Sequence, residues 1–301
     1  MDVDAILHEL TNAPAYQGQI VHIERVPARE ARFAKKSPWL PLALERALRE
    51  SGTERLYSHQ AEAIRKLAEG NNVVLVSGPA SGKSLAYQAP ILAGLDANPS
   101  QRALLLYPTK ALAQDQLRAF ERLTEKIRGF RSMIGVIDGD TPSAMRRKLA
   151  QGGRIALSNP DFLHASILSD HGKWETFFEN LRYIVLDELH VYAGLFGSNM
   201  GNVLRRLWRV LDRYGSKPQV VCGSATIANP RELAESIVGR PMHLIDDDGS
   251  PRGARTYVFW NPVKAREHGR YRRRSANVEA HRIAARLIGA GLPTIVFSKA
   301  R

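Results

Sequence analysis

The stretch Val73-Val-Leu-Val-Ser-Gly-Pro-Ala-Ser-Gly-Lys-Ser84 decides the fold class of this chain. It begins with four apolar residues, continues through a turn of small residues, and leads into a segment with helical periodicity. A buried strand followed by such a turn and a helix presents backbone N–H groups to a phosphate. The pattern for such a loop is G-x-x-x-x-G-K-[ST]. Its first position holds Ser77, with the glycine one residue later at Gly78. The end of the pattern is matched by Gly82, Lys83 and Ser84.

This loop predicts a binding site for ATP. Lys83 would neutralise the β- and γ-phosphates, and the Ser84 hydroxyl would be a ligand of Mg²⁺. The alternative is an ordinary turn before a helix, but a lysine in this position after a buried strand favours the phosphate loop. The residues that we expect around the nucleotide phosphates are Gly78, Pro79, Ala80, Ser81, Gly82, Lys83 and Ser84.

Short apolar runs alternate with helix-length segments along most of the chain. Each run is too short for a helix and is rich in valine, isoleucine or leucine on both faces, which is typical of a parallel sheet covered on both sides. This alternation predicts right-handed βαβ units and an α/β fold with a doubly wound, mostly parallel sheet. The expected strands are residues 73–76, 103–107, 133–137, 154–157, 183–186 and 219–222, and the expected helices are 84–95, 110–128, 143–151, 159–168 and 198–214.

Two adjacent acids, Asp187 and Glu188, follow the apolar run at residues 183–186. Ligands of open α/β sheets bind at the carboxyl ends of the strands. Two carboxylates that leave a buried strand are costly unless a cation or a substrate interacts with them. We expect Asp187 to share the Mg²⁺ ion with Ser84, and Glu188 to orient and deprotonate the attacking water. The alternative is an acidic pair that is simply exposed to solvent. The phosphate loop earlier in the chain favours the catalytic interpretation.

With these two elements, the chain from about Leu56 to Thr226 resembles the first motor domain of superfamily 2 helicases, a RecA-like P-loop NTPase domain. Six or more motifs follow one another in the order of the family. Tyr57-Ser-His-Gln60 looks like the family's glutamine motif, so Gln60 would hydrogen-bond the adenine edge. Asp187-Glu-Leu-His190 is similar to motif II in its D-E-x-H form. The resemblance implies a catalytic set of Lys83, Asp187, Glu188 and His190.

Further motifs imply how the nucleotide is connected to nucleic acid. Gly223-Ser-Ala-Thr226 resembles motif III, whose Ser224 and Thr226 would link the nucleotide site to strand movement through His190. Tyr107-Pro-Thr-Lys110 resembles the start of motif Ia, where a helix N-terminus meets nucleic-acid phosphates. We expect nucleic acid to cross the opposite lip of the sheet and to be held mainly by its backbone. The expected contacts are Thr109, Lys110, Asp140, Thr141 and Asn159.

A narrower likeness indicates one group of the superfamily. Residues 56–60, 138–142, 159–164 and 187–198 look like the bacterial MrfA/YprA group, which is related to RecQ4-like DNA helicases of yeast and plants. This resemblance implies an ATP-dependent DNA helicase or translocase that moves 3′→5′ on single-stranded or tailed duplex DNA and is associated with DNA repair. An RNA helicase stays open, because the D-E-x-H motif does not separate DNA from RNA. A nucleotide-dependent binding module without its own turnover also stays open.

The domain organisation that we expect has three parts. They are N-terminal accessory helices in 1–53, a RecA-like helicase domain with the ATP site in 54–247, and a linker with the beginning of a second RecA-like domain in 248–301. Within the last part, 256–260 and 294–297 are expected strands and 277–288 an expected helix. Motif VI and its arginine finger are not among these residues. An arginine finger is worth about 10³–10⁵ in rate, so we expect weak ATP turnover from this chain alone.

The net charge favours an anionic partner. The chain has 43 Lys and Arg against 30 Asp and Glu, a balance of +13, which is typical of nucleic-acid binding. Over half of this excess lies in residues 252–274, where eight basic residues accompany one acid. Tyr257, Trp260 and Tyr271 are interleaved with them. A strand-binding groove with stacking aromatics and a solvated loop whose aromatics belong to a small core are both open interpretations.

Composition also excludes several protein classes. No stretch of about 18 uncharged apolar residues exists, so no membrane-spanning helix is expected. The first seventeen residues have acids where a secretory signal would have basic residues. Cys222, the single cysteine, lies in an apolar run and is an expected core residue; it excludes an intrachain disulfide and an all-cysteine zinc site. A reduced, cytoplasmic setting without a membrane partner is expected.

Overall fold

The computed structural model describes residues 3–36, 40–127, 130, 133–267 and 270–298. The chain forms two compact units, one of residues 30–251 and one that joins residues 1–29 with 252–301. Leu40 and the buried residues Leu44, Ala47 and Leu48 of α2 (Leu42–Glu50) belong to the core of the larger unit. The functional domain boundaries that we expect from the sequence, after residues 53 and 247, stay a prediction.

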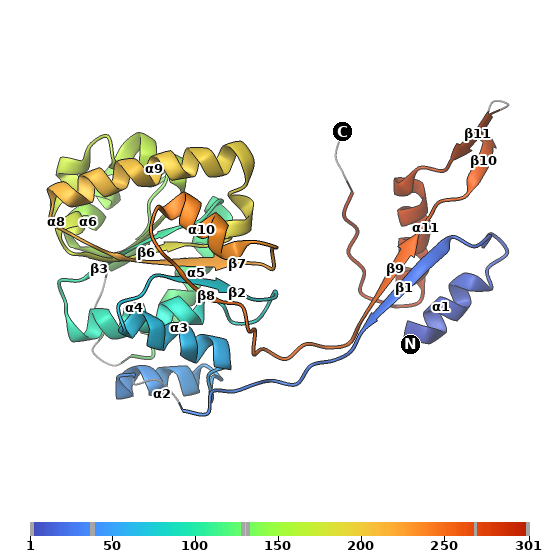
Figure 1. Cartoon of the computed structure of the whole chain (residues 1–301), viewed down its shortest axis with the longest axis horizontal. Coiled ribbons are helices and arrows are strands. Elements are labelled where there is room, and N and C mark those ends of the chain that lie inside the picture. The colour runs from blue at the N-terminus through green and yellow to red at the C-terminus, as the bar shows by residue number, and fades with distance from the viewer. Residues whose placement is uncertain (1–2, 37–39, 128–129, 131–132, 268–269, 299–301) are drawn as a thin grey trace. The chain divides into compact units, whose positions relative to one another are not determined.

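A seven-stranded sheet is the centre of the larger unit (Figure 1). Its strand order is β4-β5-β3-β6-β7-β2-β8, and every neighbouring pair is parallel. The doubly wound α/β fold is therefore confirmed. The edge strand β8 was not expected, because it has three residues and two of them are only half-buried. The strands are β2 (Val73–Val76), β3 (Arg102–Leu106), β4 (Met133–Val136), β5 (Gly153–Ser158), β6 (Leu181–Leu186), β7 (Gln219–Ser224) and β8 (His243–Ile245).

Helices cover both faces of this sheet (Figure 1). One face is covered by α2, α3 (Ser58–Ala68), α4 (Leu85–Ala97) and α5 (Lys110–Thr124), and the other by α6 (Ser143–Gly152), α8 (Glu175–Glu179), α9 (Gly194–Arg213) and α10 (Pro230–Val238). The helix expected at 159–168 is shorter as an α-helix. It starts as α7 (Pro160–Phe162) and continues as a π-helix over Leu163–Ile167.

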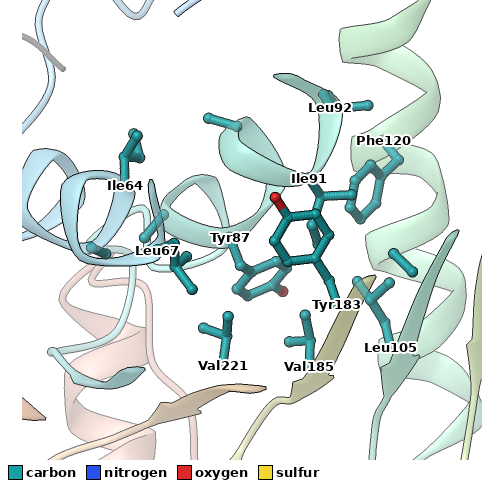
Figure 2. Close-up of a cluster of buried hydrophobic side chains, with 14 of the residues drawn as sticks. Ile64, Leu67, Tyr87, Ile91, Leu92, Leu105, Phe120, Tyr183, Val185 and Val221 are labelled. Carbon is teal, nitrogen blue, oxygen red and sulfur yellow. The ribbon is translucent and has the colours of Figure 1, made fainter. Parts of the chain in front are cut away.

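The core consists of two apolar layers, because successive strand residues point to opposite faces of a sheet. Leu105, Val185 and Val221 belong to the layer under α3, α4 and α5, whereas their strand neighbours belong to the other. Figure 2 shows this first layer, with Tyr87 of α4 lying above Val185 and Val221. Cys222 is fully buried in the second layer, as expected for a core residue.

The smaller unit contains two short antiparallel sheets. One pairs β1 (Ile20–Val26) with β9 (Arg255–Trp260), and the other pairs β10 (Lys264–Glu267) with β11 (Arg270–Arg273). Two helices complete the unit, α1 (Val3–Thr11) and α11 (Ala276–Gly289). The expected strand at 256–260 and helix at 277–288 are thus confirmed. We expected only helices in the N-terminal segment, but it also contains β1. The middle residues of β1 are exposed, so its sequence lacks the apolar pattern of a core strand.

Two expectations for this unit change. The strand predicted at 294–297 is wrong: no strand among the described residues pairs with this segment, and Ile295 and Phe297 are 80% and 91% exposed. The basic loop forms the hairpin β10–β11 instead. Trp260 packs on Tyr16 and donates its Nε1–H to Glu279 at 2.9 Å, so this aromatic belongs to a small core. The side chain of Tyr271 lies outside the described part.

No helix in the described part of the chain is long and apolar enough to cross a membrane.

Candidate functional site

The phosphate loop connects β2 to α4 at the carboxyl edge of the sheet. Ala80 and Gly82 have left-handed backbones, with φ of 58° and 71°. A Cβ at position 82 would lie 2.5 Å from Gln60 Nε2, so only glycine fits there. The hydroxyls of Ser77 and Ser81 are 2.6 Å apart and close the base of the loop. A non-glycine residue in this rarely populated conformation is typical of a ligand site.

Gln60 is held against this loop by both ends of its amide. Its Oε1 accepts a hydrogen bond from the Tyr57 N–H at 2.9 Å, and its Nε2 donates to the Gly82 carbonyl at 3.0 Å. Each end of a glutamine amide can make a further hydrogen bond. Gln60 also lines a cavity of about 780 Å³ that reaches Ala80 and Gly82. The glutamine is therefore placed to contact a flat polar group in that cavity.

Two aromatic residues and one arginine line the same cavity. The rings of Phe33 and Tyr57 stack at 5.4 Å, and the Arg55 guanidinium lies 4.4 Å from the centre of the Phe33 ring. Phe33 and Arg55 were not among the predicted site residues. Phe33 lies upstream of the glutamine motif and contacts it through an isolated bridge and ring stacking with Tyr57, which no local pattern could predict.

Asp187 follows β6 and is almost fully buried, and each of its carboxylate oxygens accepts a hydrogen bond. Its Oδ1 accepts from the Glu188 N–H at 2.9 Å, and its Oδ2 accepts from the Tyr87 hydroxyl at 2.8 Å. A Cβ at Gly223 would collide with Asp187 Oδ1 and would lie 3.4 Å from Lys83 Cδ. The structure therefore brings Lys83 and Asp187 together across the backbone of β7.

The phenol beside Asp187 keeps its proton. Burial, together with the charge of Asp187, raises the pKa of Tyr87 well above its ordinary value. Burial also raises the pKa of Tyr107, whose hydroxyl is 3.3 Å from that of Tyr87. Tyr87 is therefore the donor and Asp187 the acceptor in their hydrogen bond.

Glu188 turns away from the strand through a left-handed backbone, with φ 55° and ψ 44°. Among the described residues, Ala80 and Glu188 are the two non-glycine residues with positive φ, and both lie in this site. His190 Nδ1 is 3.3 Å from Glu188 Oε2 and 3.2 Å from the Ala225 N–H. It can accept from the amide when neutral at this nitrogen, or donate to the carboxylate when protonated there.

His190 thus contacts the backbone of Ala225, between Ser224 and Thr226, the two residues expected to link the nucleotide site to strand movement. The Ser224 hydroxyl is buried and has no hydrogen-bond partner among the described groups. The Ser224 carbonyl accepts the Ser77 N–H at 3.2 Å, which joins β7 to the phosphate loop. Thr226 is exposed. Ser224 is therefore fastened to the loop by its backbone, while its side chain is free to take a new partner.

Ser84 and Asp187 offer a hydroxyl and a carboxylate oxygen, the ligand type that Mg²⁺ prefers. No group of three or more His, Cys, Asp or Glu side chains in the described ranges could hold a metal ion. Magnesium commonly has few protein ligands and relies on substrate phosphates and water for the rest. The residues present fit an ion of this kind and do not form an all-protein metal cage.

A model of DEAD/DEAH box helicases matches residues 57–234, more than half of the chain. The chain belongs to the DEAD/DEAH box helicase family. The matched region starts at the glutamine motif and contains the phosphate loop, motif II and motif III. The predicted helicase family and its α/β fold are therefore confirmed.

Relatives in the family cover nearly the whole chain. The uncharacterized ATP-dependent helicase YprA of Bacillus subtilis is 42% identical over 282 residues, which are 94% of this chain and 37% of that protein. The ATP-dependent helicase HRQ1 of Saccharomyces cerevisiae is 36% identical over 303 residues, 99% of this chain and 28% of that protein. The chain therefore spans between about a quarter and two fifths of the length of these relatives.

A solved member of the family has the same fold over nearly the whole chain. The crystal structure of the helicase MrfA bound to DNA matches with a TM-score of 0.87 at 39% identity, covering 96% of this chain and 38% of that one. The structure of MrfA with DNA and AMPPNP matches equally well. The resemblance to the MrfA/YprA group is therefore confirmed.

The residues expected to contact nucleic acid mostly serve local structure. Thr109 Oγ1 accepts the Leu112 N–H at 3.3 Å and caps α5, and Asn159 Oδ1 accepts the Phe162 N–H at 2.8 Å and caps α7. Lys110 and Asp140 form an exposed ion pair, with 2.5 Å between Nζ and Oδ2. Thr141 Oγ1 accepts from the Asp138 N–H at 3.0 Å. All five side chains thus have a local hydrogen-bond or ion-pair partner.

Their location corrects one expectation. Thr109, Asp140 and Asn159 follow β3, β4 and β5, whereas the phosphate loop and motifs II and III follow β2, β6 and β7. All these strands are parallel, so both sets of residues lie at the same carboxyl edge of the sheet. Our prediction that the expected nucleic-acid contacts lie at the opposite edge is therefore wrong. The strand order β4-β5-β3-β6-β7-β2 separates the sets into two halves of that edge.

Proposed function

We propose that this chain is the ATP-binding motor portion of an ATP-dependent DNA helicase or translocase. The observation that carries the proposal is the meeting of Lys83 and Asp187 at Gly223, beside a phosphate loop with a left-handed turn. Such an arrangement aims a cation, a carboxylate and a helix N-terminus at one point, as phosphoryl transfer requires. The likeness to MrfA bound to DNA supports DNA as the partner.

Each residue of the site has a role in this proposal. Lys83 neutralises the phosphates, and Glu188 orients the attacking water and accepts its proton. Mg²⁺, held by Ser84 and Asp187, would stabilise the charge that develops on the phosphates. Gln60 would hydrogen-bond the adenine, which the neighbouring cavity can accommodate.

DNA would cross the half of the carboxyl edge formed by β4, β5 and β3. The amides at the start of α5, behind Thr109 and Lys110, are available to phosphates. Contacts to the strand backbone predict little preference for base sequence. Movement in the 3′→5′ direction and a role in DNA repair, both implied by the resemblance, stay predictions.

Nucleotide binding by the chain is the first test. We expect Lys83→Ala to abolish binding of a fluorescent ATP analogue, whereas Lys148→Ala, an exposed lysine on α6, binds as the wild type does. Glu188→Gln should keep binding but lower hydrolysis by about 10²–10⁴ in the full-length enzyme. Normal hydrolysis by Glu188→Gln would show that the base is another residue.

The kind of nucleic acid is the second test. We expect single-stranded DNA to stimulate the ATPase of the full-length enzyme more than RNA of the same length does. Stronger stimulation by RNA would instead indicate an RNA helicase. Nucleotide-dependent binding of DNA with no stimulation by either polymer would indicate a binding module.

A further inference from the structure

Buried hydroxyl and amide groups connect Asp187 to helix α5. The Tyr87 hydroxyl is 2.8 Å from Asp187 Oδ2, 3.3 Å from the Tyr107 hydroxyl and 3.3 Å from Gln116 Oε1. The same Gln116 oxygen accepts from Gln88 Nε2 at 3.1 Å. Tyr87 and Tyr107 are each 1% exposed. Water cannot easily replace a lost partner in such a place, so these hydrogen bonds constrain one another.

The network ends on the elements that carry the expected DNA contacts. Tyr107 directly follows β3 and precedes Thr109 by two residues. Gln116 lies on α5, the helix that Thr109 caps and Lys110 begins. The network therefore joins the ATP half of the carboxyl edge to its nucleic-acid half through side chains alone.

The hydroxyl of Tyr87 has one proton, and its possible acceptors are Asp187 Oδ2, Gln116 Oε1 and the Tyr107 hydroxyl. Asp187 Oδ2 is nearer than Gln116 Oε1, at 2.8 against 3.3 Å, and an ionised carboxylate is the stronger acceptor. A cation bound to Asp187 would withdraw negative charge from that carboxylate and weaken it as an acceptor. The proton would then be shared more with Gln116 and Tyr107, which changes the forces on α5 and on the segment that follows β3.

The hydroxyl is not needed to fill the core. The Tyr87 ring packs in the apolar layer above Val185 and Val221 (Figure 2), and phenylalanine would make the same ring contacts. A purely structural explanation would therefore accept phenylalanine at this position. The polar contacts to Asp187 and Gln116 are what the hydroxyl adds.

We propose that Tyr87 is a positioning residue whose hydroxyl couples the state of Asp187 to α5, so that nucleotide and DNA bind cooperatively. The proposal rests on the proposed function. Coupling between two sites is reciprocal, and each ligand changes the affinity for the other by one factor, typically about 5–150-fold. That factor is the quantity that the Tyr87 hydroxyl should change.

The experiment measures this factor in the chain and in its Tyr87→Phe variant. Affinity for a fluorescent ATP analogue with Mg²⁺ is determined with and without a saturating single-stranded DNA oligonucleotide. We expect DNA to raise the nucleotide affinity of the wild type by about fivefold or more. In Tyr87→Phe the factor should fall by at least about threefold, while the affinity without DNA changes less.

Tyr183→Phe is the matched control. Tyr183 belongs to the same apolar layer (Figure 2), but no hydrogen bond joins its hydroxyl to the network in the described residues. Its coupling factor should equal that of the wild type. Should Tyr87→Phe fail to fold, Gln116→Met removes the other end of the network and should lower the factor in the same way.

Three outcomes would overturn parts of this account. A Tyr87→Phe or Gln116→Met variant with the wild-type factor would overturn the coupling role, as would a wild type that binds both ligands independently. A wild type that binds no ATP analogue at all would overturn the proposed function itself. The two failures are therefore distinguishable in one titration series.

Discussion

The Gly78 N–H donates a hydrogen bond to Asp248 Oδ2, with 3.1 Å between nitrogen and oxygen. The other oxygen of Asp248 accepts from the N–H and the hydroxyl of Ser250, at 2.9 and 2.7 Å. The next residue, Gly249, donates its N–H to the buried His59 Nδ1 at 3.1 Å. The segment after β8, which has the turn chemistry of a linker, is therefore bound to the phosphate loop and to α3.

Asp248 should make stability depend on pH in the acid range. Burial raises the pKa of its carboxyl group, but hydrogen bonds from Ser250 and Gly78 and the nearby His59 outweigh this effect, so the pKa lies below its ordinary value. A depressed folded-state pKa contributes stability above the unfolded value, about 3.9, and this contribution is lost as pH falls through the folded pKa. Between about pH 4.5 and 3, the wild type should lose more free energy of unfolding than Asp248→Asn.

Urea titrations at several pH values check this prediction, with the exposed Asp246→Asn as the control. Asp246→Asn should follow the wild-type slope. Parallel curves for the wild type and Asp248→Asn would contradict the assigned role.

Gly223 should not tolerate a side chain. In Gly223→Ala the new methyl group collides with Asp187 Oδ1 and crowds Lys83. We expect a loss of about 1–3 kcal/mol in the free energy of unfolding, and weaker Mg²⁺-dependent nucleotide binding because the carboxylate is displaced. Gly172→Ala is the control, since no heavy atom lies within 4 Å of its Cβ position. Melting curves and nucleotide titrations measure both effects, and an unchanged affinity would disprove the proximity of these groups.

The Thr109 side chain should matter as a helix cap. Thr109→Ala removes the acceptor for the Leu112 N–H and should lower the free energy of unfolding by about 1 kcal/mol. It should also weaken DNA binding, because the first turn of α5 would be less ordered and its free N–H groups would bind phosphates less well. Thr109→Ser keeps the hydroxyl and should retain both properties. Urea unfolding and fluorescence anisotropy with labelled DNA test this, and equal behaviour of the two variants would rule out the cap.

Cys222 should be unreactive in the folded protein. Burial, with a smaller effect of the Asp187 charge, raises the pKa of its thiol far above the ordinary range, and the thiolate is the reactive form. A thiol reagent should therefore modify native protein at least about a hundredfold more slowly than the urea-unfolded chain. Since this is the single cysteine, absorbance of the released reagent counts it directly. Rapid stoichiometric labelling of native protein would refute the burial.

Local sequence patterns were sufficient for the parallel strands and the phosphate loop. The apolar runs are short and continuous, and the order of small residues, lysine and serine after Val76 has one well-known structural meaning. Asp187 and Glu188 could be assigned because a strand end and two carboxylates are adjacent in the chain. In each case, the local structure depends on a few neighbouring residues, so it can be predicted from the sequence without knowledge of the fold.

The remaining structure depends on which distant segments come together. Strand β1 was missed because it pairs with β9 across more than 200 residues, and the strand expected at 294–297 does not form because apolar residues alone supply no hydrogen-bonding neighbour. No sequence motif indicated Tyr87, although it lies one helical turn after Ser84. Its hydroxyl partner, Asp187, lies 100 residues away.

Sequence alone therefore predicted a P-loop domain of the helicase family, because the groups expected to bind phosphate and metal occupy short motifs with local chemistry. Tertiary structure alone decided that these motifs and the expected DNA contacts share one edge of the sheet, and that Asp248 supports the phosphate loop from 170 residues away. The reason is the strand order. It is set by the packing of two helical layers on the whole sheet, and it determines which loop ends become neighbours.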